Sequence, residues 1–219
     1  MEERTKSRGR KARAAERSLD SSASEGAAPA PTKKRTGQVE TVGELLHWSY
    51  ACHAAASAAA EAGLARYDTR CWMIRAKLFK GLRAGTMKVG SLFADVRDMP
   101  RDRCVYCGAA PPPKLHGDHL IPRHRGGPES GDNLVWACRS CNSSKSARDL
   151  LEWYASKEKF PPLLLLRRYL KLAMAEAEAR QIMGAKLVDR PSVTFSIEHV
   201  PVKYPQPSEF GPPFEAGVM

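Results

Sequence analysis

Hydrophobic residues recur at helical spacing in three long stretches of the chain. The first stretch runs from Thr41 to about Arg66 and is rich in alanine. Thr41 is followed three residues later by Glu44, which fits a capping box, so we predict a helix that begins here. We expect the potentially reactive side chains within this helix to serve its surface and core: His47, Cys52 and His53.

The second stretch, residues 69–84, has an apolar face and a basic face. At 100° per residue its apolar side chains fall together and three basic ones fall opposite. The apolar set is Cys71, Ile74, Leu78 and Leu82, and the basic set is Arg70, Lys77 and Lys80. From Arg66 to Lys88 there are seven basic residues, and the only acidic one is Asp68. We therefore predict that this stripe contacts the DNA backbone; the alternative is an ordinary solvated face.

The third stretch predicts a helix from Leu163 to about Met183, with Gly184 as its stop. Its leucines from 163 to 166, with Leu170 and Met174, should form core. A shorter helix is predicted from Arg148 to about Ser156, with Leu150, Leu151 and Trp153 as its packing face. Residues 191–219 are rich in proline and contain a short strand-like segment, SVTFSIEHV, in which we find no chemistry.

Between these helices the pattern changes to short strands. Residues 116–121 predict one strand and residues 134–137 a second, with proline, glycine and polar residues between them. From about Arg139 the chain becomes helical again. The predicted order is therefore strand, loop, strand and helix, within a module spanning residues 98–156.

The net charge of the chain indicates which class of partner it binds. The 219 residues carry a formal net charge of +11, which favours a polyanion such as nucleic acid, with an anionic membrane surface second. No apolar run is long enough to span a bilayer, and the charged N-terminus does not resemble a secretory signal, so we expect a cytoplasmic protein, nucleoid-associated if bacterial. Residues 1–40 form a basic tail that we predict to be disordered; it would tether the protein to DNA or merely keep it soluble.

Four of the six cysteines form two C-x-x-C pairs, Cys104 with Cys107 and Cys138 with Cys141. Four thiolates favour zinc in a closed tetrahedral site, which leaves no open position for catalysis. We therefore predict a structural zinc ion. Thirty residues separate Cys107 from Cys138, more than the usual ribbon spacing of about 15–20. The insert contains GDHLIP and DNLVW, and CNSSK begins at the last cysteine.

These elements resemble the HNH nuclease family, with its ββα-metal fold, in the branch that has a four-cysteine zinc site. The matching residues are Asp118, His119, Asn133, Asn142 and Lys145. His119 and Asn133 are fourteen residues apart, and Asn133 and Asn142 nine. The same steps occur in the HNH domain of the CRISPR RNA-guided nucleases. The resemblance covers residues 103–153, about a quarter of the chain, and does not extend to the flanking helices.

The resemblance implies roles for these residues. His119 would be the general base that takes a proton from water, and Asp118 would hold a divalent cation. Asn133 would steady the loop and the base. Asn142 stands where the family often has a metal-binding histidine, and since an amide oxygen is a harder donor than imidazole, we predict Mg²⁺ or Mn²⁺ here over Zn²⁺ or Ni²⁺. Neighbouring residues of a regular strand point to opposite faces, so Asp118 and His119 cannot both face one pocket from an ideal strand. Either the strand is bulged or ends there, or the phosphate lies at its edge and is reached from both sides.

The loop residues carry weaker signals. Arg123, His124 and Arg125 would touch a phosphate or simply be solvated, the latter being favoured for His124. Lys145 would contact DNA or be a plain exposed lysine.

The expected fold is α+β and mostly helical: a zinc-stapled ββα-metal HNH module flanked by helices. Residues 41–97 form a helical, basic region, residues 98–156 the nuclease module, and residues 157–219 a helix with a proline-rich extension.

The leading hypothesis is a metal-dependent DNA endonuclease that nicks as a monomer and could cut both strands as a homodimer. A zinc module that only binds DNA or RNA is the main alternative, and a zinc domain for protein contacts is a third. RNA is the less favoured substrate.

Overall fold

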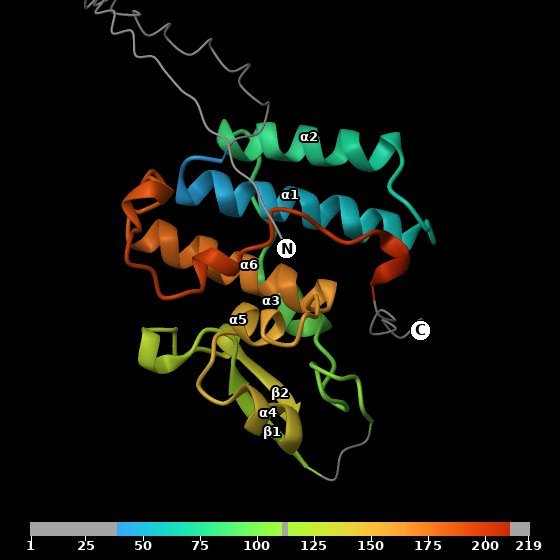
Figure 1. The fold of residues 1–219 in the computed structure, drawn as a ribbon, viewed down its shortest axis with the longest axis vertical. Coiled ribbons are helices and arrows are strands. Elements are labelled where there is room, and N and C mark those ends of the chain that lie inside the picture. The colour runs from blue at the N-terminus through green and yellow to red at the C-terminus, as the bar shows by residue number, and fades with distance from the viewer. Residues whose placement is uncertain (1–38, 111–113, 211–219) are drawn as a thin grey trace, which may run out of the picture. The chain divides into compact units, whose positions relative to one another are not determined.

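The computed structural model describes residues 39–110 and 114–210. The predicted disorder of residues 1–38 therefore lies outside the described residues, as do Pro111–Pro113 and the last nine residues of the C-terminal extension. In Figure 1 the helices α2, α1 and α6 lie in successive layers, and the hairpin of β1 and β2 lies beyond α5.

Helix α1, Val42–Glu61, begins at the predicted residue. The Thr41 side chain accepts a hydrogen bond from the Glu44 backbone amide at 3.2 Å. In a capping box the Glu44 carboxylate would accept a second hydrogen bond from the Thr41 amide. Here it accepts instead from the amide of Glu40, one residue earlier. The helix ends at Glu61 rather than Arg66, and Gly63 turns the chain with a φ of 64°, a conformation that glycine adopts without strain.

Helix α2, Thr69–Arg83, confirms the predicted division into two faces. Its N-cap is Asp68, whose side chain accepts from the Cys71 amide. Cys71 and Leu82 are buried against α1, whereas Arg70, Lys77 and Lys80 are exposed. The helix thus presents a basic surface to solvent.

Helix α3, Leu92–Asp98, was not predicted as a separate element. Ser91 caps it, and its Asp95 is buried in ion pairs with Arg167 and Lys171 of α6 at 2.7 Å each. A seven-residue helix with one polar side chain buried has no clear hydrophobic period, which explains why the pattern does not reveal it.

Helix α6, Leu163–Ala179, is shorter than predicted. The backbone leaves the helix at Arg180, and Gln181 takes the left-handed conformation with a φ of 57°. Gly184 is therefore not the stop. Leu165, Leu166, Leu170 and Met174 are buried as expected, whereas Leu163 and Leu164 are only half-buried, and α1 packs between α6 and α2.

The predicted strand, loop, strand and helix are present. Strand β1, Leu115–His119, pairs antiparallel with β2, Leu134–Cys138, so that Asp118 faces Val135 and His119 faces Leu134. Helix α4, Arg139–Lys145, follows directly, and α5, Leu150–Ala155, is capped by Asp149. The first strand ends at His119, two residues before the predicted Ile121, because the amide and carbonyl of Ile121 bond to the Asn133 side chain instead of to a partner strand. That loop contains the 3₁₀ turns η1, Arg123–Arg125, and η2, Gly131–Asn133.

The segment SVTFSIEHV is not a strand. Residues 194–196 are all buried in succession, which the alternation of a half-buried strand does not permit, and Ile197–His199 form a 3₁₀ turn, η4. Two similar turns flank it, η3 at Leu187–Asp189 and η5 at Pro207–Glu209. This extension packs back on the helices: the Trp48 indole donates to the Val202 carbonyl and the Tyr67 hydroxyl to that of Pro205.

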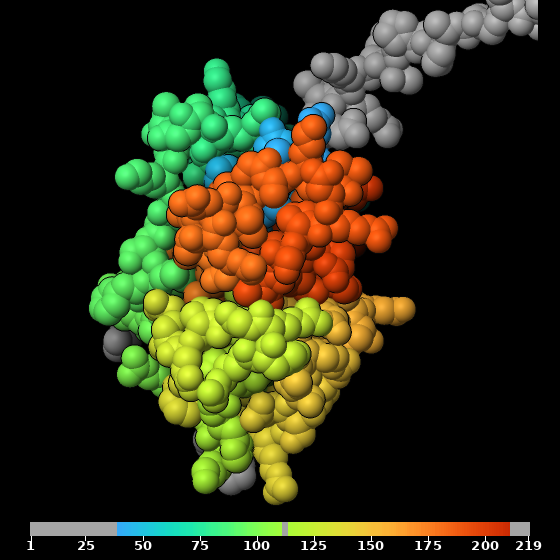
Figure 2. Space-filling model, turned by 90° about the vertical axis from the view of Figure 1, so that its left-hand side faces the viewer, coloured from blue at the N-terminus to red at the C-terminus, as the bar shows by residue number. Residues whose placement is uncertain are grey.

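One hydrophobic core joins the module to the helices. It includes Leu46 of α1, Ile121 beside β1, Leu150 of α5 and Leu170 of α6. The fold is therefore mostly helical with a small two-stranded sheet, as predicted. Figure 2 shows α2 (green) and the hairpin module (yellow-green and gold) at opposite ends of the view, with C-terminal residues between them. Within the described ranges, no helix combines the length and apolar character that crossing a membrane would require.

Candidate active site and cysteine cluster

The four predicted cysteines meet at the base of the hairpin. The Sγ atoms of Cys104, Cys107, Cys138 and Cys141 all lie within 4.8 Å of one another. Those of Cys107 and Cys138 are 4.0 Å apart. Four sulfurs around a tetrahedral zinc ion, with bonds of about 2.3 Å, lie roughly 3.8 Å apart, so the donor set fits zinc. Cys104 is buried and Cys107 exposed, which places the cluster at the surface end of the core.

One cysteine of the cluster is set up to ionise. Burial opposes ionisation of the Cys138 thiol, but hydrogen bonds from Ser140 and Cys141 outweigh it and lower the pKa to about 6. The Ser140 hydroxyl lies 3.1 Å from that sulfur. Burial instead raises the pKa of the Cys104 and Cys141 thiols. Zinc binds thiolates, so the cluster should release protons when it is loaded.

A cleft of about 650 Å³ opens where β1 ends. Its walls include Asp118, His119 and Lys145, with Arg123, His124 and Glu129 of the loop at its rim. The strand end resolves the problem of adjacent residues pointing to opposite faces. Asp118 is 7% exposed and turns inward, His119 is half-buried on the other side, and both reach the same cleft.

The Asp118 carboxylate is held from two directions. The Tyr106 hydroxyl donates to Oδ2 at 2.6 Å, and the Lys145 ammonium lies 3.2 Å from each oxygen. Burial, together with the negative charge of Asp118, raises the pKa of the Tyr106 hydroxyl, which therefore stays a proton donor. The carboxylate is thus fixed in position beside the cleft.

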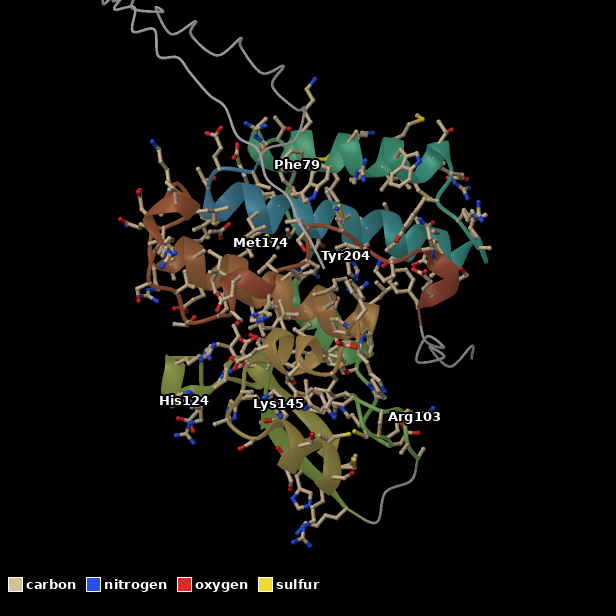
Figure 3. All side chains as sticks on the ribbon, in the orientation of Figure 1. Phe79, Arg103, His124, Lys145, Met174 and Tyr204 are labelled. Atoms are coloured by element: carbon tan, nitrogen blue, oxygen red, sulfur yellow. The ribbon has the colours of Figure 1, made fainter. Side chains whose placement is uncertain are left out.

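Lys145 differs from the expectation of a surface lysine. Its side chain is 1% exposed, and Nζ also donates to the His119 carbonyl at 2.7 Å. Burial lowers the pKa of this ammonium, and the charge of Asp118 partly offsets that effect. Figure 3 places Lys145 within the module and His124 on the loop beside it. The ammonium therefore holds the Asp118–His119 pair instead of lying on the surface, where it could meet DNA.

Asn133 supports the loop from within. It is fully buried, and its Oδ1 accepts from the Ile121 amide at 2.9 Å. Its Nδ2 donates to the carbonyls of Ile121 and Pro128 at 2.8 and 2.9 Å. These bonds fix the chain immediately after His119.

Asn142 does not share these contacts. It lies on the first turn of α4 and is half-buried, but among the described residues it is not part of the cleft wall, and no side-chain contact joins it to Asp118. The residue on α4 that reaches Asp118 is Lys145, one turn further on.

Residues 104–148 match the family model described as HNH endonuclease. This part of the chain is an HNH domain. The match covers about a fifth of the chain. No curated protein and no solved structure matches the chain. The HNH domain connects the protein with nuclease-type, nucleic-acid-related function.

The loop arginines of the HNH domain are at the surface but are paired. Arg123 contacts Glu129 at 3.2 Å, and Arg125 contacts Glu152 of α5 at 2.7 Å. Exposed pairs of this kind contribute little to stability. The basic residues of α2 lie on the far side of α1 and α6 from the HNH domain (Figure 1). They are exposed as predicted, but the structure does not bring them to the cleft.

Two contacts of the HNH domain were not foreseen. Tyr106, inside the first C-x-x-C pair, reaches Asp118. Arg168 of α6 is 1% exposed and donates to the carbonyls of Gly131, Asp132 and Leu134 at 2.5, 2.7 and 2.9 Å. Neither has a sequence signal, because an arginine within a leucine-rich helix and a tyrosine within a zinc knuckle look like ordinary surface and core residues.

Proposed function

We propose that the protein is a metal-dependent HNH-type endonuclease that hydrolyses phosphodiester bonds in DNA. The observation that carries this proposal is the meeting of Asp118 and His119 in one cleft, at the end of a strand whose base is gathered around four cysteines. A module that only binds nucleic acid does not need an acid and a half-buried histidine on the wall of the same cleft.

His119 is the proposed general base. The Lys145 bond to its carbonyl and the Asn133 bonds to Ile121 fix the backbone that follows it, and from this position the imidazole would take a proton from water. The attack would break one phosphodiester bond and leave the proton on His119. One such site cuts one strand, so a monomer nicks and a homodimer could make a double-strand break.

Asp118 is the proposed ligand for a catalytic divalent cation. It offers a hard carboxylate oxygen on the cleft wall, and Mg²⁺ is commonly held by one or two carboxylates together with waters and substrate phosphate. When bound, Mg²⁺ or Mn²⁺ would supply Lewis-acid stabilisation of the charge on the leaving oxygen. Asn142 stays a proposed second donor, and Cys104, Cys107, Cys138 and Cys141 are the proposed structural zinc ligands.

DNA is the proposed partner, and two groups of basic residues would bind its backbone. Arg123 and Arg125 stand near the cleft, and Arg70, Lys77 and Lys80 form the separate basic surface on α2. Their contribution to the affinity for DNA should fall as the salt concentration rises. A plot of log K against log salt concentration should become steeper by about 0.9 for each phosphate that they neutralise.

The test is the nicking of supercoiled plasmid by protein stripped of loosely bound metal but retaining zinc, with and without Mg²⁺. The wild type should nick with Mg²⁺, and His119→Ala should lose at least about 100-fold, the usual contribution of a general base. His47→Ala on α1 is the matched control and should nick as the wild type does. Zinc content and melting of all three proteins would establish that they are folded. If folded wild type binds DNA but nicks none, the reading as a non-catalytic zinc module replaces this proposal.

A further inference from the structure

Lys145 occupies the position of a counter-cation to Asp118. Its ammonium is 3.2 Å from both carboxylate oxygens, in a pair whose side chains are 1% and 9% exposed. Around the same carboxylate, the remaining described contact is the neutral Tyr106 hydroxyl. In the free protein, Lys145 therefore provides the positive charge that a buried carboxylate needs.

A divalent cation on Asp118 would meet this ammonium at close range. A charge within about 4–6 Å shifts the affinity of a carboxyl group for a proton by one to three pKa units, which is tenfold or more. Repulsion from the same charge should weaken the binding of Mg²⁺ or Mn²⁺ by at least a similar factor, because the added cation carries two charges.

We propose that Lys145 is a positioning residue that holds Asp118 and the His119 carbonyl in the free protein and, by its charge, limits the affinity of Asp118 for the catalytic cation. The inference rests on the proposed function, since it takes Asp118 as the metal ligand.

The test measures Mn²⁺ binding directly, by electron paramagnetic resonance of free Mn²⁺, in zinc-loaded full-length protein without DNA. Lys145→Met removes the charge at similar length and should bind Mn²⁺ at least about tenfold more tightly than the wild type. Lys145→Arg keeps the charge and should bind as the wild type does. Asp118→Asn combined with Lys145→Met should lose the gain.

Stability provides a second readout. Lys145→Met leaves a buried carboxylate without its partner, so it should melt at a lower temperature than the wild type, and Mn²⁺ should restore more of the loss than it adds to the wild type. If Lys145→Met does not fold without metal, Lys145→Gln, which keeps a hydrogen-bond donor, takes its place in both measurements. A purely structural lysine would lower the melting temperature without changing the affinity for Mn²⁺, and that result would overturn the inference.

Cleavage separates this inference from the proposed function. If the wild type nicks plasmid with Mn²⁺ but the Lys145→Met affinity is unchanged, the inference fails and the nuclease stands. If Lys145→Met gains tight binding through Asp118 while folded wild type cuts no DNA, the inference stands and the nuclease fails.

Discussion

The side-chain amide of Asn133 pairs with the backbone of Ile121 in both directions. Oδ1 accepts from the Ile121 amide at 2.9 Å, and Nδ2 donates to the Ile121 carbonyl at 2.8 Å. The same Nδ2 also donates to the Pro128 carbonyl. One buried side chain therefore closes the loop that leaves β1 directly after His119.

Replacing Asn133 with alanine should loosen this loop. Two carbonyls and one amide would lose their partners in a buried position, so we expect a loss of about 3 kcal/mol in the free energy of unfolding. Nicking should fall as well, because the backbone that follows His119 is no longer fixed. Urea unfolding would measure the stability, with the exposed neighbour Ser130→Ala as the control. Unchanged stability of Asn133→Ala would show that the loop is held by other contacts.

Arg168 ties the helical part of the chain to the same loop. Its guanidinium donates to three backbone carbonyls around η2, and the fork of donors matches this arrangement, whereas a lysine ammonium is a single point charge. Arg168→Lys should therefore cost about 2 kcal/mol in unfolding free energy. Arg180→Lys, at the exposed end of α6, is the control and should change it by less than about 0.5 kcal/mol. Equal unfolding free energies of Arg168→Lys and Arg180→Lys would show that Arg168 does not tie α6 to the loop.

The parts of this site that depend on residue motifs with fixed spacing can be predicted from the sequence. The parts that depend on one side chain contacting a residue distant in the sequence cannot be predicted as well. The C-x-x-C pairs and the adjacent Asp118 and His119 stand in local patterns, so the cysteine cluster and the order of strand, loop, strand and helix can be predicted from the sequence. Lys145 stands on a short helix among polar residues, and only the packing of α4 on β1 shows that it is buried. The predicted end of α6 at Gly184 is wrong because Gln181, not a glycine, adopts the left-handed conformation.

Zinc removal should unfold the hairpin of the HNH domain. Structural zinc of this kind supplies about 10 kcal/mol or more, which exceeds what a two-stranded sheet can supply by itself. Cys141→Ser should lose zinc and the dispersed amide signals of residues 104–110 and 114–148, measured by metal analysis and NMR. Cys71→Ala, a buried cysteine outside the cluster, should keep both. A folded, zinc-free Cys141→Ser protein would contradict the structural role.

Asp149 should make stability depend on pH in a defined direction. Burial raises the pKa of its carboxyl to about 6, although the Tyr169 hydroxyl donates to both of its oxygens. The folded protein therefore holds this proton more tightly than the unfolded chain, whose carboxyl has the ordinary pKa of 3.8. The stability from this group is fully present below pH 3.8 and is lost as the pH rises through about 6.

Asp149→Asn removes this dependence and keeps a side-chain oxygen for the Leu151 amide. The unfolding free energy of the wild type should decrease relative to that of Asp149→Asn by about 2–3 kcal/mol between pH 4 and pH 7. Urea unfolding of both proteins across this range would measure it. Protonation of the zinc thiolates affects both equally and cancels in the difference. A difference that does not change with pH would show that Asp149 ionises normally.

The basic surface of α2 should matter only for long DNA. Helix α1 packs between α2 and α6, and the hairpin lies beyond them, so a duplex that only fills the cleft does not reach Arg70, Lys77 or Lys80 (Figure 1). The triple alanine variant of these residues should therefore cut a duplex short enough only to fill the cleft at the wild-type rate but bind plasmid more weakly. Its logarithmic salt slope on plasmid should be shallower by about 2.7 if all three contact phosphates.

A charge-matched control separates position from net charge. Alanine at Lys159, Lys186 and Lys203, which are exposed lysines outside α2, removes the same number of charges. If the α2 variant and this control weaken plasmid binding equally, general attraction to a basic protein accounts for the effect. Equal impairment of the α2 variant on short and long DNA would instead place α2 in contact with the strand being cut. Loss on plasmid alone, and in the α2 variant alone, would make this helix a tether that holds DNA at a distance from the HNH domain.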